Sequence, residues 1–273
     1  LPMAGILHTA QPDYVQLGAP GESEEAFADR MVADLRALIE REDPETIGAF
    51  FAEPVSVSAA LALPPKTYWE KITALLAEYE IRLFDDEVVT GFGRTGNTFG
   101  AETYGMAPDC MTVAKALTSA YQPLSAVLMS EEFYEGLERG SETVGMFSHA
   151  GTYHGHPVPA AVALRVLELM EERDILGHVR AISPHFAASL AKVEDHPLVS
   201  RSRSVGLAGA VDLTKDGAEA GALGAEVAAR CEANGLVIRP SGDTIVMAPP
   251  LIITPGEIDE MFRRFRLALD ETL

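Results

Sequence analysis

Short apolar runs that alternate with longer amphipathic stretches constrain the fold of this chain more than any other feature. The runs at 47–52, 81–84, 111–114 and 126–129 have the length and mainly apolar character of buried strands. Apolar residues at helical spacing follow Ser23, which favours helix N-termini, and a second such stripe follows residues 64–65, both proline. Strands that alternate with helices predict an α/β fold with a mostly parallel sheet and helices on both of its faces.

The pattern changes in the last hundred residues. A long helix is predicted from Pro157 toward Arg173. Beyond it, strand candidates at 207–213, 236–238 and 244–247 alternate with helices near 217–233 and 255–271. We therefore expect a domain boundary near residue 175, with a larger domain over 1–175 and a smaller α+β domain over 176–273.

Composition excludes several classes of protein. The 273 residues are 47% hydrophobic, enough for a substantial core, and carry a formal net charge of −20, which repels nucleic acids and anionic membrane surfaces. No apolar run approaches the roughly 18 residues of a membrane span. Cys110 and Cys231 show no metal-binding spacing and are too few for a disulfide framework, so we expect a reducing, cytoplasmic setting. The first residue, Leu1, is not methionine, and this start suggests an internal fragment or a missing N-terminal part.

Two charged residues lie where ligands bind in open α/β sheets, beyond the carboxyl ends of strands. Lys115 closes the run 111–114, where partial desolvation would favour a neutral, nucleophilic amine. The alternative is a lysine that extends into solvent. Asp86 follows the run 81–84 and is either a solvated residue of a loop or helix cap, or the carboxylate partner of a protonated ring nitrogen.

The glycine-rich stretch 91–96 reads GFGRTG. It resembles a phosphate-binding loop only in its glycine content, because it lacks Walker spacing and no clear helix follows it. Taken alone, it predicts a tight turn that depends on glycine.

Three motifs in order give a more specific signal. Residues 86–96 read DEVVTGFGRTG, residues 112–118 read TVAKALT and residues 149–157 read HAGTYHGHP. Together they resemble the signature segments of class III aminotransferases, which depend on pyridoxal 5'-phosphate (PLP). The likeness runs from GESEE at 21–25 to APPLIIT at 248–254. It implies the fold-type-I architecture, as a partial large domain and a C-terminal small domain.

The resemblance implies a role for four residues. Lys115 matches the lysine that holds the cofactor covalently and moves a proton, and Asp86 matches the partner of the pyridine nitrogen. Val88 matches the residue packed on one face of the ring, or is ordinary core. Thr152 matches the threonine that reaches the cofactor phosphate of the other subunit, or caps the helix at Pro157. Class III enzymes share their sites across a dimer interface, so the resemblance also implies a homodimer.

The subtype is indicated by a segment near the C-terminus. Residues 235–240 read GLVIRP, which is similar to the ω-transaminases that act on amines with pyruvate. In that group, an arginine at the position of Arg239 binds a carboxylate or swings away for an apolar amine, a role that suits a guanidinium. The alternative is a surface charge. Ornithine-type members carry a fixed arginine at the position of Val246. Both the ornithine and the 4-aminobutyrate enzymes usually carry a Gly-Glu pair where this chain has Val57-Ser58.

Two departures from the family stand out. Residues 56–60 read SVSAA where the family is rich in glycine, and the Cβ atoms are expected to bar positive φ there. The family's N-terminal portion, which supplies the main phosphate loop and the residue stacked on the ring, has no counterpart in these residues.

Three interpretations remain open. The first is an ω-type aminotransferase that moves an amino group from an amine or ω-amino acid to a keto acid such as pyruvate. The second keeps PLP but is an aminomutase or decarboxylase of the same fold. The third is an inactive, truncated chain without cofactor.

Overall fold

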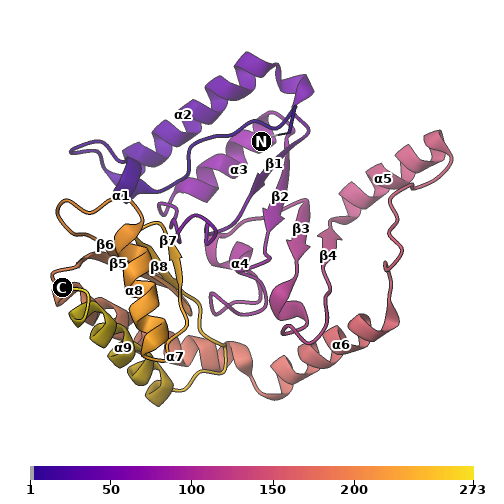
Figure 1. Cartoon of the computed structure of the whole chain (residues 1–273). Coiled ribbons are helices and arrows are strands. Elements are labelled where there is room, and N and C mark those ends of the chain that lie inside the picture. Colours follow the sequence, from indigo (N-terminus) through magenta and orange to yellow (C-terminus); the bar gives the residue numbers. More distant parts are fainter. Residues whose placement is uncertain (1–2) are drawn as a thin grey trace.

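A four-stranded sheet organises the first half of the chain in the computed structural model, which describes residues 3–273 (Figure 1). Its strands, in spatial order, are β1 (Ala49–Ala52), β2 (Arg82–Asp86), β3 (Cys110–Val113) and β4 (Ala126–Met129). β1, β2 and β3 are parallel, and β4 runs antiparallel to β3. The predicted α/β fold with a mostly parallel sheet is confirmed, and each strand lies within two residues of its apolar run.

Two long helices pack with this sheet through their apolar stripes. α2 (Glu24–Glu42) begins after Ser23, whose hydroxyl accepts a hydrogen bond from the Ala26 N–H, and α3 (Tyr68–Glu78) follows the two prolines. Phe27 of α2, Trp69 of α3 and Leu83 of β2 belong to one buried cluster. Shorter turns complete this part of the chain: α1 (Tyr14–Leu17), η1 (Pro44–Thr46), α4 (Gly100–Tyr104) and η2 (Lys115–Leu117).

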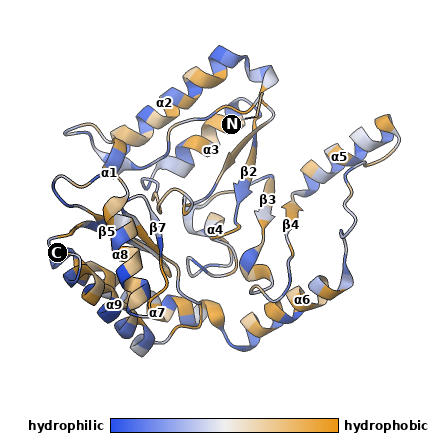
Figure 2. Ribbon diagram, viewed as in Figure 1, coloured by the Kyte–Doolittle hydropathy of each residue, from blue (hydrophilic) through white to orange (hydrophobic). Residues whose placement is uncertain are grey.

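Two helices and the segment between them extend away from the sheet, at the right of Figure 1. α6 (Pro157–Glu172) was predicted, whereas α5 (Glu131–Val144) was not. None of the α5 side chains is buried among the described residues, although Phe133 packs edge-on against Phe84 of β2, with 5.4 Å between the ring centroids. Both helices carry apolar and polar residues along their length (Figure 2).

A second, antiparallel sheet follows, with strands β5 (Val199–Val205), β6 (Ala208–Leu213), β8 (Thr244–Met247) and β7 (Arg239–Ser241) in that spatial order. Its helices are α7 (Ile175–Ala191), α8 (Ala222–Ala233) and α9 (Pro255–Asp270), with η3 (Lys192–Asp195) between α7 and β5. One buried cluster joins the three helices to β5, β6 and β8.

One prediction for this region is wrong, and two of its elements were not predicted. The strand expected at 236–238 is wrong: Leu236 and Ile238 pack against the core without joining the ladder, and pairing starts at Arg239. β5 was not predicted because serine and arginine fill most of its positions, and most of them are only half-buried. α7 was not predicted, and it contains Pro184.

We propose the domain boundary near residue 175. Asp174 adopts a left-handed conformation between α6 and α7, and it caps α7 through the Gly177 N–H at 3.1 Å. In the cluster that joins α7, α8 and α9 to the second sheet, every buried residue lies at or after Ile175. Within residues 3–273, no helix has the length and apolar character needed to cross a membrane.

Candidate active site

Asp86 is the last residue of β2 and lies on the exposed side of that strand. Leu83, Asp85 and Glu87 are buried, while Asp86 between them is exposed, as the two-residue period of a strand requires. Asp86 Oδ1 accepts a hydrogen bond from the Val88 N–H at 2.9 Å. Among residues 3–273, the other carboxylate oxygen accepts no hydrogen bond and remains available to a ligand.

Lys115 lies at the corresponding end of the neighbouring parallel strand. Asp86 and Thr112 are directly opposed in the β2–β3 register, and Lys115 follows Thr112 by three residues. The structure therefore brings Asp86 and Lys115 to the same edge of the sheet, the edge where ligands bind in α/β folds. The expected desolvation is wrong: Lys115 is exposed, and within the described part of the chain its amine forms no ion pair.

The backbone around Lys115 is strained. Lys115 has φ 44°, and Ser119 and Ala120 have φ 48° and 63°. Side chains with a Cβ rarely occupy this left-handed region, and such residues cluster at functional sites. Leu117 and Thr118 are buried between them, and the Thr118 hydroxyl donates to the Gln122 carbonyl at 2.6 Å. Packing of this turn thus fixes where the lysine leaves the sheet.

Val88 is half-buried immediately beyond Asp86, at the sheet edge that holds Asp86 and Lys115. Its N–H is the donor to Asp86, so the two residues are held in one turn. The position of Val88 fits both an ordinary core residue and a residue that packs on one face of a bound ring.

The two sequence neighbours of the exposed Asp86, Asp85 and Glu87, are buried acids. The Glu87 carboxylate accepts the Gly100 N–H at 2.9 Å and the Ala101 N–H at 2.7 Å, and so caps the first turn of α4. Both carboxyl oxygens of Asp85 are buried without a hydrogen-bond partner among the described residues. Burial, with a contribution from Glu87 and Asp86, raises the pKa of Asp85 to about 9, so this carboxyl is neutral at physiological pH.

The glycine-rich stretch 91–96 is a tight turn, as its residues predict. Gly93 and Gly96 have φ 105° and 94°. The turn docks the second sheet: the Arg94 guanidinium donates to the Leu207 carbonyl at 3.0 Å and to the Pro249 carbonyl at 2.6 Å. Burial lowers the pKa of Arg94 to about 10, which leaves it charged at neutral pH.

Thr152 and Arg239 lie apart from the Asp86–Lys115 edge. Thr152 is exposed in the segment between α5 and α6, and it does not cap the helix: His156 does, through the Val158 N–H at 3.2 Å. Arg239 is exposed at the start of β7, directly opposite Val246 of β8. Both therefore lie on other segments than β2 and β3, whose ends carry Asp86 and Lys115.

Several polar residues near this edge were not singled out from the sequence. Asp85 could have been found from strand periodicity, which places it on the buried side with Leu83. Arg94 and Arg203 act on backbone carbonyls more than a hundred residues away in sequence, and no local pattern encodes such contacts.

The Asp86–Lys115 edge lies within a chain that a family profile covers almost completely. The profile described as Aminotransferase class-III matches residues 2–269. The chain belongs to the class III aminotransferases. Members of this family use PLP.

Relatives of known sequence agree with this assignment. Gamma aminobutyrate transaminase 1, mitochondrial, of Solanum lycopersicum is 42% identical over 100% of this chain, which covers 54% of that protein. An uncharacterized aminotransferase of Sinorhizobium fredii is 43% identical over 96% of this chain and 58% of its own length. The chain thus spans little more than half the length of these curated relatives.

Solved structures confirm the predicted PLP-transaminase fold. The omega transaminase from Pseudomonas jessenii in complex with PMP is 40% identical and matches with a TM-score of 0.97, over 100% of this chain and 61% of that one. A thermostable 6-fold mutant of an omega transaminase from the same organism matches with the same score over 62% of its length.

Proposed function

We propose that this chain carries the lysine and aspartate side of the cofactor site in an aminotransferase of the ω type. The observation that supports this most is the register of β2 and β3, which brings Asp86 and Lys115 to one edge of the sheet in a class III chain. The reaction proposed moves an amino group from an amine or ω-amino acid to a keto acid such as pyruvate.

The residues at this edge fit PLP by their chemistry. The exposed Lys115 offers a primary amine for covalent attachment, and the unused oxygen of Asp86 is an acceptor for a protonated ring nitrogen. Val88 offers an apolar surface to one face of the ring. When bound, the cofactor supplies the electron sink for the substrate carbon. Lys115 Nζ would move a proton between that carbon and the cofactor, while Asp86 would keep the ring nitrogen protonated.

Arg239 is the proposed carboxylate-binding residue. It is exposed at the edge strand β7 with no ion pair among the described residues, so its guanidinium is available to a bidentate carboxylate. Val246, where ornithine-type members carry a fixed arginine, is its direct cross-strand neighbour. The two positions therefore lie side by side, and a single mobile arginine suits an enzyme that admits both a keto acid and an apolar amine.

The protein is proposed to act as a homodimer, in which Thr152 reaches the cofactor phosphate of the partner subunit. The segment that carries Thr152 exposes large apolar side chains: Met146, Phe147 and Tyr153 are 66%, 58% and 79% exposed. Contiguous apolar exposure of this kind is typical of protein interfaces.

A cytoplasmic location remains part of the proposal. It is supported by Cys110 and Cys231, which are both free thiols in buried positions. Several plant relatives carry mitochondrial or chloroplastic names, so fractionation of the native host is the direct test.

The function is tested by product analysis with the complete protein and PLP. An apolar amine and 4-aminobutyrate are each supplied with pyruvate, and alanine is measured. Alanine that depends on both substrates supports the proposal. Amine isomerisation or release of carbon dioxide without alanine identifies the aminomutase or decarboxylase, and a protein that takes up no PLP is the inactive form.

Arg239→Leu gives a matched test of the substrate assignment. It should raise KM for 4-aminobutyrate and pyruvate while KM for the apolar amine stays within about twofold, because only the carboxylates lose a charge-assisted partner. An equal rise for all substrates would contradict the role.

A further inference from the structure

A loop at the carboxyl end of β1 is held in a conformation that normally requires glycine. Ser56 and Ala62 close this loop through two backbone hydrogen bonds of 3.2 and 3.0 Å. Ala60 and Leu61, near its end, have φ 62° and 60°. The expectation that the Cβ atoms of residues 56–60 bar positive φ is therefore wrong at Ala60. Two successive left-handed residues with side chains are costly and persist only where their surroundings hold them.

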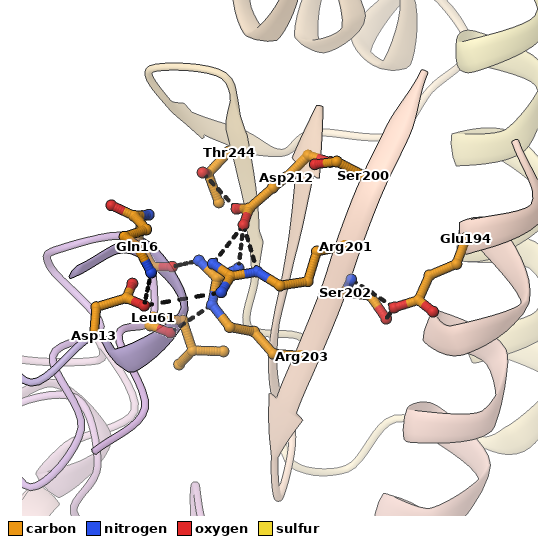
Figure 3. A network of polar contacts seen from close by, with 11 residues as sticks. Asp13, Gln16, Leu61, Glu194, Ser200, Arg201, Ser202, Arg203, Asp212 and Thr244 are labelled. Carbon is orange, nitrogen blue, oxygen red and sulfur yellow. Dashed lines mark hydrogen bonds and ion pairs between the residues drawn. The ribbon is translucent and has the colours of Figure 1, made fainter. Parts of the chain in front are cut away.

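The surroundings that hold the loop come from the second sheet. Arg203 of β5 donates from Nε to the Leu61 carbonyl at 2.7 Å and from its terminal nitrogen to the Ala60 carbonyl (Figure 3). The Leu61 side chain is fully buried beside Ala208 and Ala210 of β6. Both strained residues are thus fixed from the same side, through their carbonyls and through the Leu61 side chain.

Arg203 is itself oriented by a second network. Its other terminal nitrogen donates to Asp212 at 2.8 Å, and the same carboxylate accepts the Thr244 hydroxyl at 2.7 Å. Arg201 also binds Asp212, at 2.8 Å through Nε, and faces Asp13 at 3.8 Å (Figure 3), but among residues 3–273 it donates no hydrogen bond to the loop. Arg201 and Arg203 therefore share Asp212 as a partner, but Arg203 also donates to the loop carbonyls whereas Arg201 faces Asp13.

The base of the loop is joined to the candidate site. The Glu53 carboxylate accepts the Val57 N–H at 3.0 Å, and the Pro54 carbonyl accepts the Trp69 indole at 2.9 Å. Pro54 and Thr90 both lie close to Gly100. A Cβ added to Gly100 would be 3.1 Å from the Pro54 Cβ and 2.8 Å from the Thr90 Cβ. Ala52 at the end of β1 is directly opposed to Asp85 of the parallel strand β2, so the segment that leads into the loop leaves the sheet at the same edge as Asp86.

We propose that Arg203 is a positioning residue of the transaminase, which holds the 56–62 loop in its left-handed conformation and thereby sets the shape of the substrate side of the site. The inference rests on the proposed function. Ala60 and Leu61 stand where glycine would adopt this conformation without strain. The guanidinium of Arg203, from the second sheet, stabilises the conformation instead. Loss of Arg203 should loosen the loop and weaken substrate binding without removing any group that takes part in the chemistry.

The test compares Arg203→Gln with Arg201→Gln in the complete holoenzyme. Arg203→Gln should raise amine KM about tenfold, equivalent to about 1.4 kcal/mol, with kcat within about threefold. Arg201→Gln, which removes a guanidinium from the same carboxylate, should leave KM unchanged. Ala60→Gly added to Arg203→Gln should restore much of the loss, because glycine occupies positive φ without strain.

Amide hydrogen exchange supplies a readout that does not depend on activity. Exchange at Ser56 and Ala62 should accelerate in Arg203→Gln and stay as in the parent in Arg201→Gln. If the protein proves to have no transaminase activity, exchange still decides whether Arg203 holds the loop. Unchanged exchange in Arg203→Gln, an equal KM effect of both variants, or no rescue by Ala60→Gly would overturn the proposal.

Discussion

Replacing Asp85 by asparagine should stabilise the protein, and should do so more strongly as pH rises. Asp85 is 1% exposed, and both of its oxygens lack partners among the described residues. Burial raises its pKa from 3.8 to about 9, so the folded state holds a proton that the unfolded state releases near neutral pH. The stability associated with this group is complete below the unfolded pKa and declines as pH rises toward the folded pKa.

The magnitude follows from the pKa shift. Each pH unit between the two pKa values removes about 1.4 kcal/mol from the free energy of unfolding. From about pH 5 to about pH 8, the contribution of Asp85 should therefore fall by up to about 4 kcal/mol. Asparagine keeps the shape of the side chain but has no proton to lose, so Asp85→Asn is expected to lack this decline.

The assay is urea unfolding of the complete protein at several pH values. Plotted against pH, the difference in unfolding free energy between Asp85→Asn and the parent should rise steadily up to about pH 9 and then level off. Asp216→Asn changes the same charge on an exposed loop and serves as the control. A difference for Asp85→Asn that does not vary with pH would refute the reasoning.

Three further outcomes are expected. Asp86→Asn should keep the fold, by circular dichroism, yet lose most of the transamination rate, and a normal rate would contradict its role. Gly206→Ala should lower the free energy of unfolding by more than about 1 kcal/mol, because φ is 55° and the new Cβ would lie 2.6 Å from Thr95 Cα; an unchanged urea midpoint would show that the turn relaxes. Residues 1–273 expressed alone should be apo, poorly soluble and inactive, since Val127 and Leu128 of the outer strand β4 are exposed, and saturable PLP uptake with turnover would show this to be wrong.

Periodic apolar patterns explain which parts of the fold could be predicted from the sequence. The four strands of the first sheet were predicted from short continuous apolar runs, and α2 and α6 from apolar positions that recur at helical spacing. α5 contacts β2 through residues of its first turn, such as Phe133 against Phe84, and has no buried residue among those described, while β5 presents mainly polar side chains. β5 therefore lacks the apolar alternation that marks a half-buried strand.

The candidate site divides in the same way. Asp86 and Lys115 were predicted because they follow apolar strands within specific motifs. The exposure of Lys115 was not predicted, because the burial of a residue at a strand end depends on which distant segments cover it. Arg203 was missed since its bond to the Leu61 carbonyl spans 142 residues of sequence, and the positive φ of Ala60 depends on that distant support.

Covalent attachment of PLP to Lys115 tests the central claim most directly. The complete protein is incubated with PLP, reduced with borohydride, digested and mapped by mass spectrometry, with Lys115→Ala and the exposed Lys66→Ala in parallel. The account predicts a single modified peptide that contains Lys115, lost in Lys115→Ala and kept in Lys66→Ala. Stoichiometric fixation of PLP at another lysine in Lys115→Ala would contradict it.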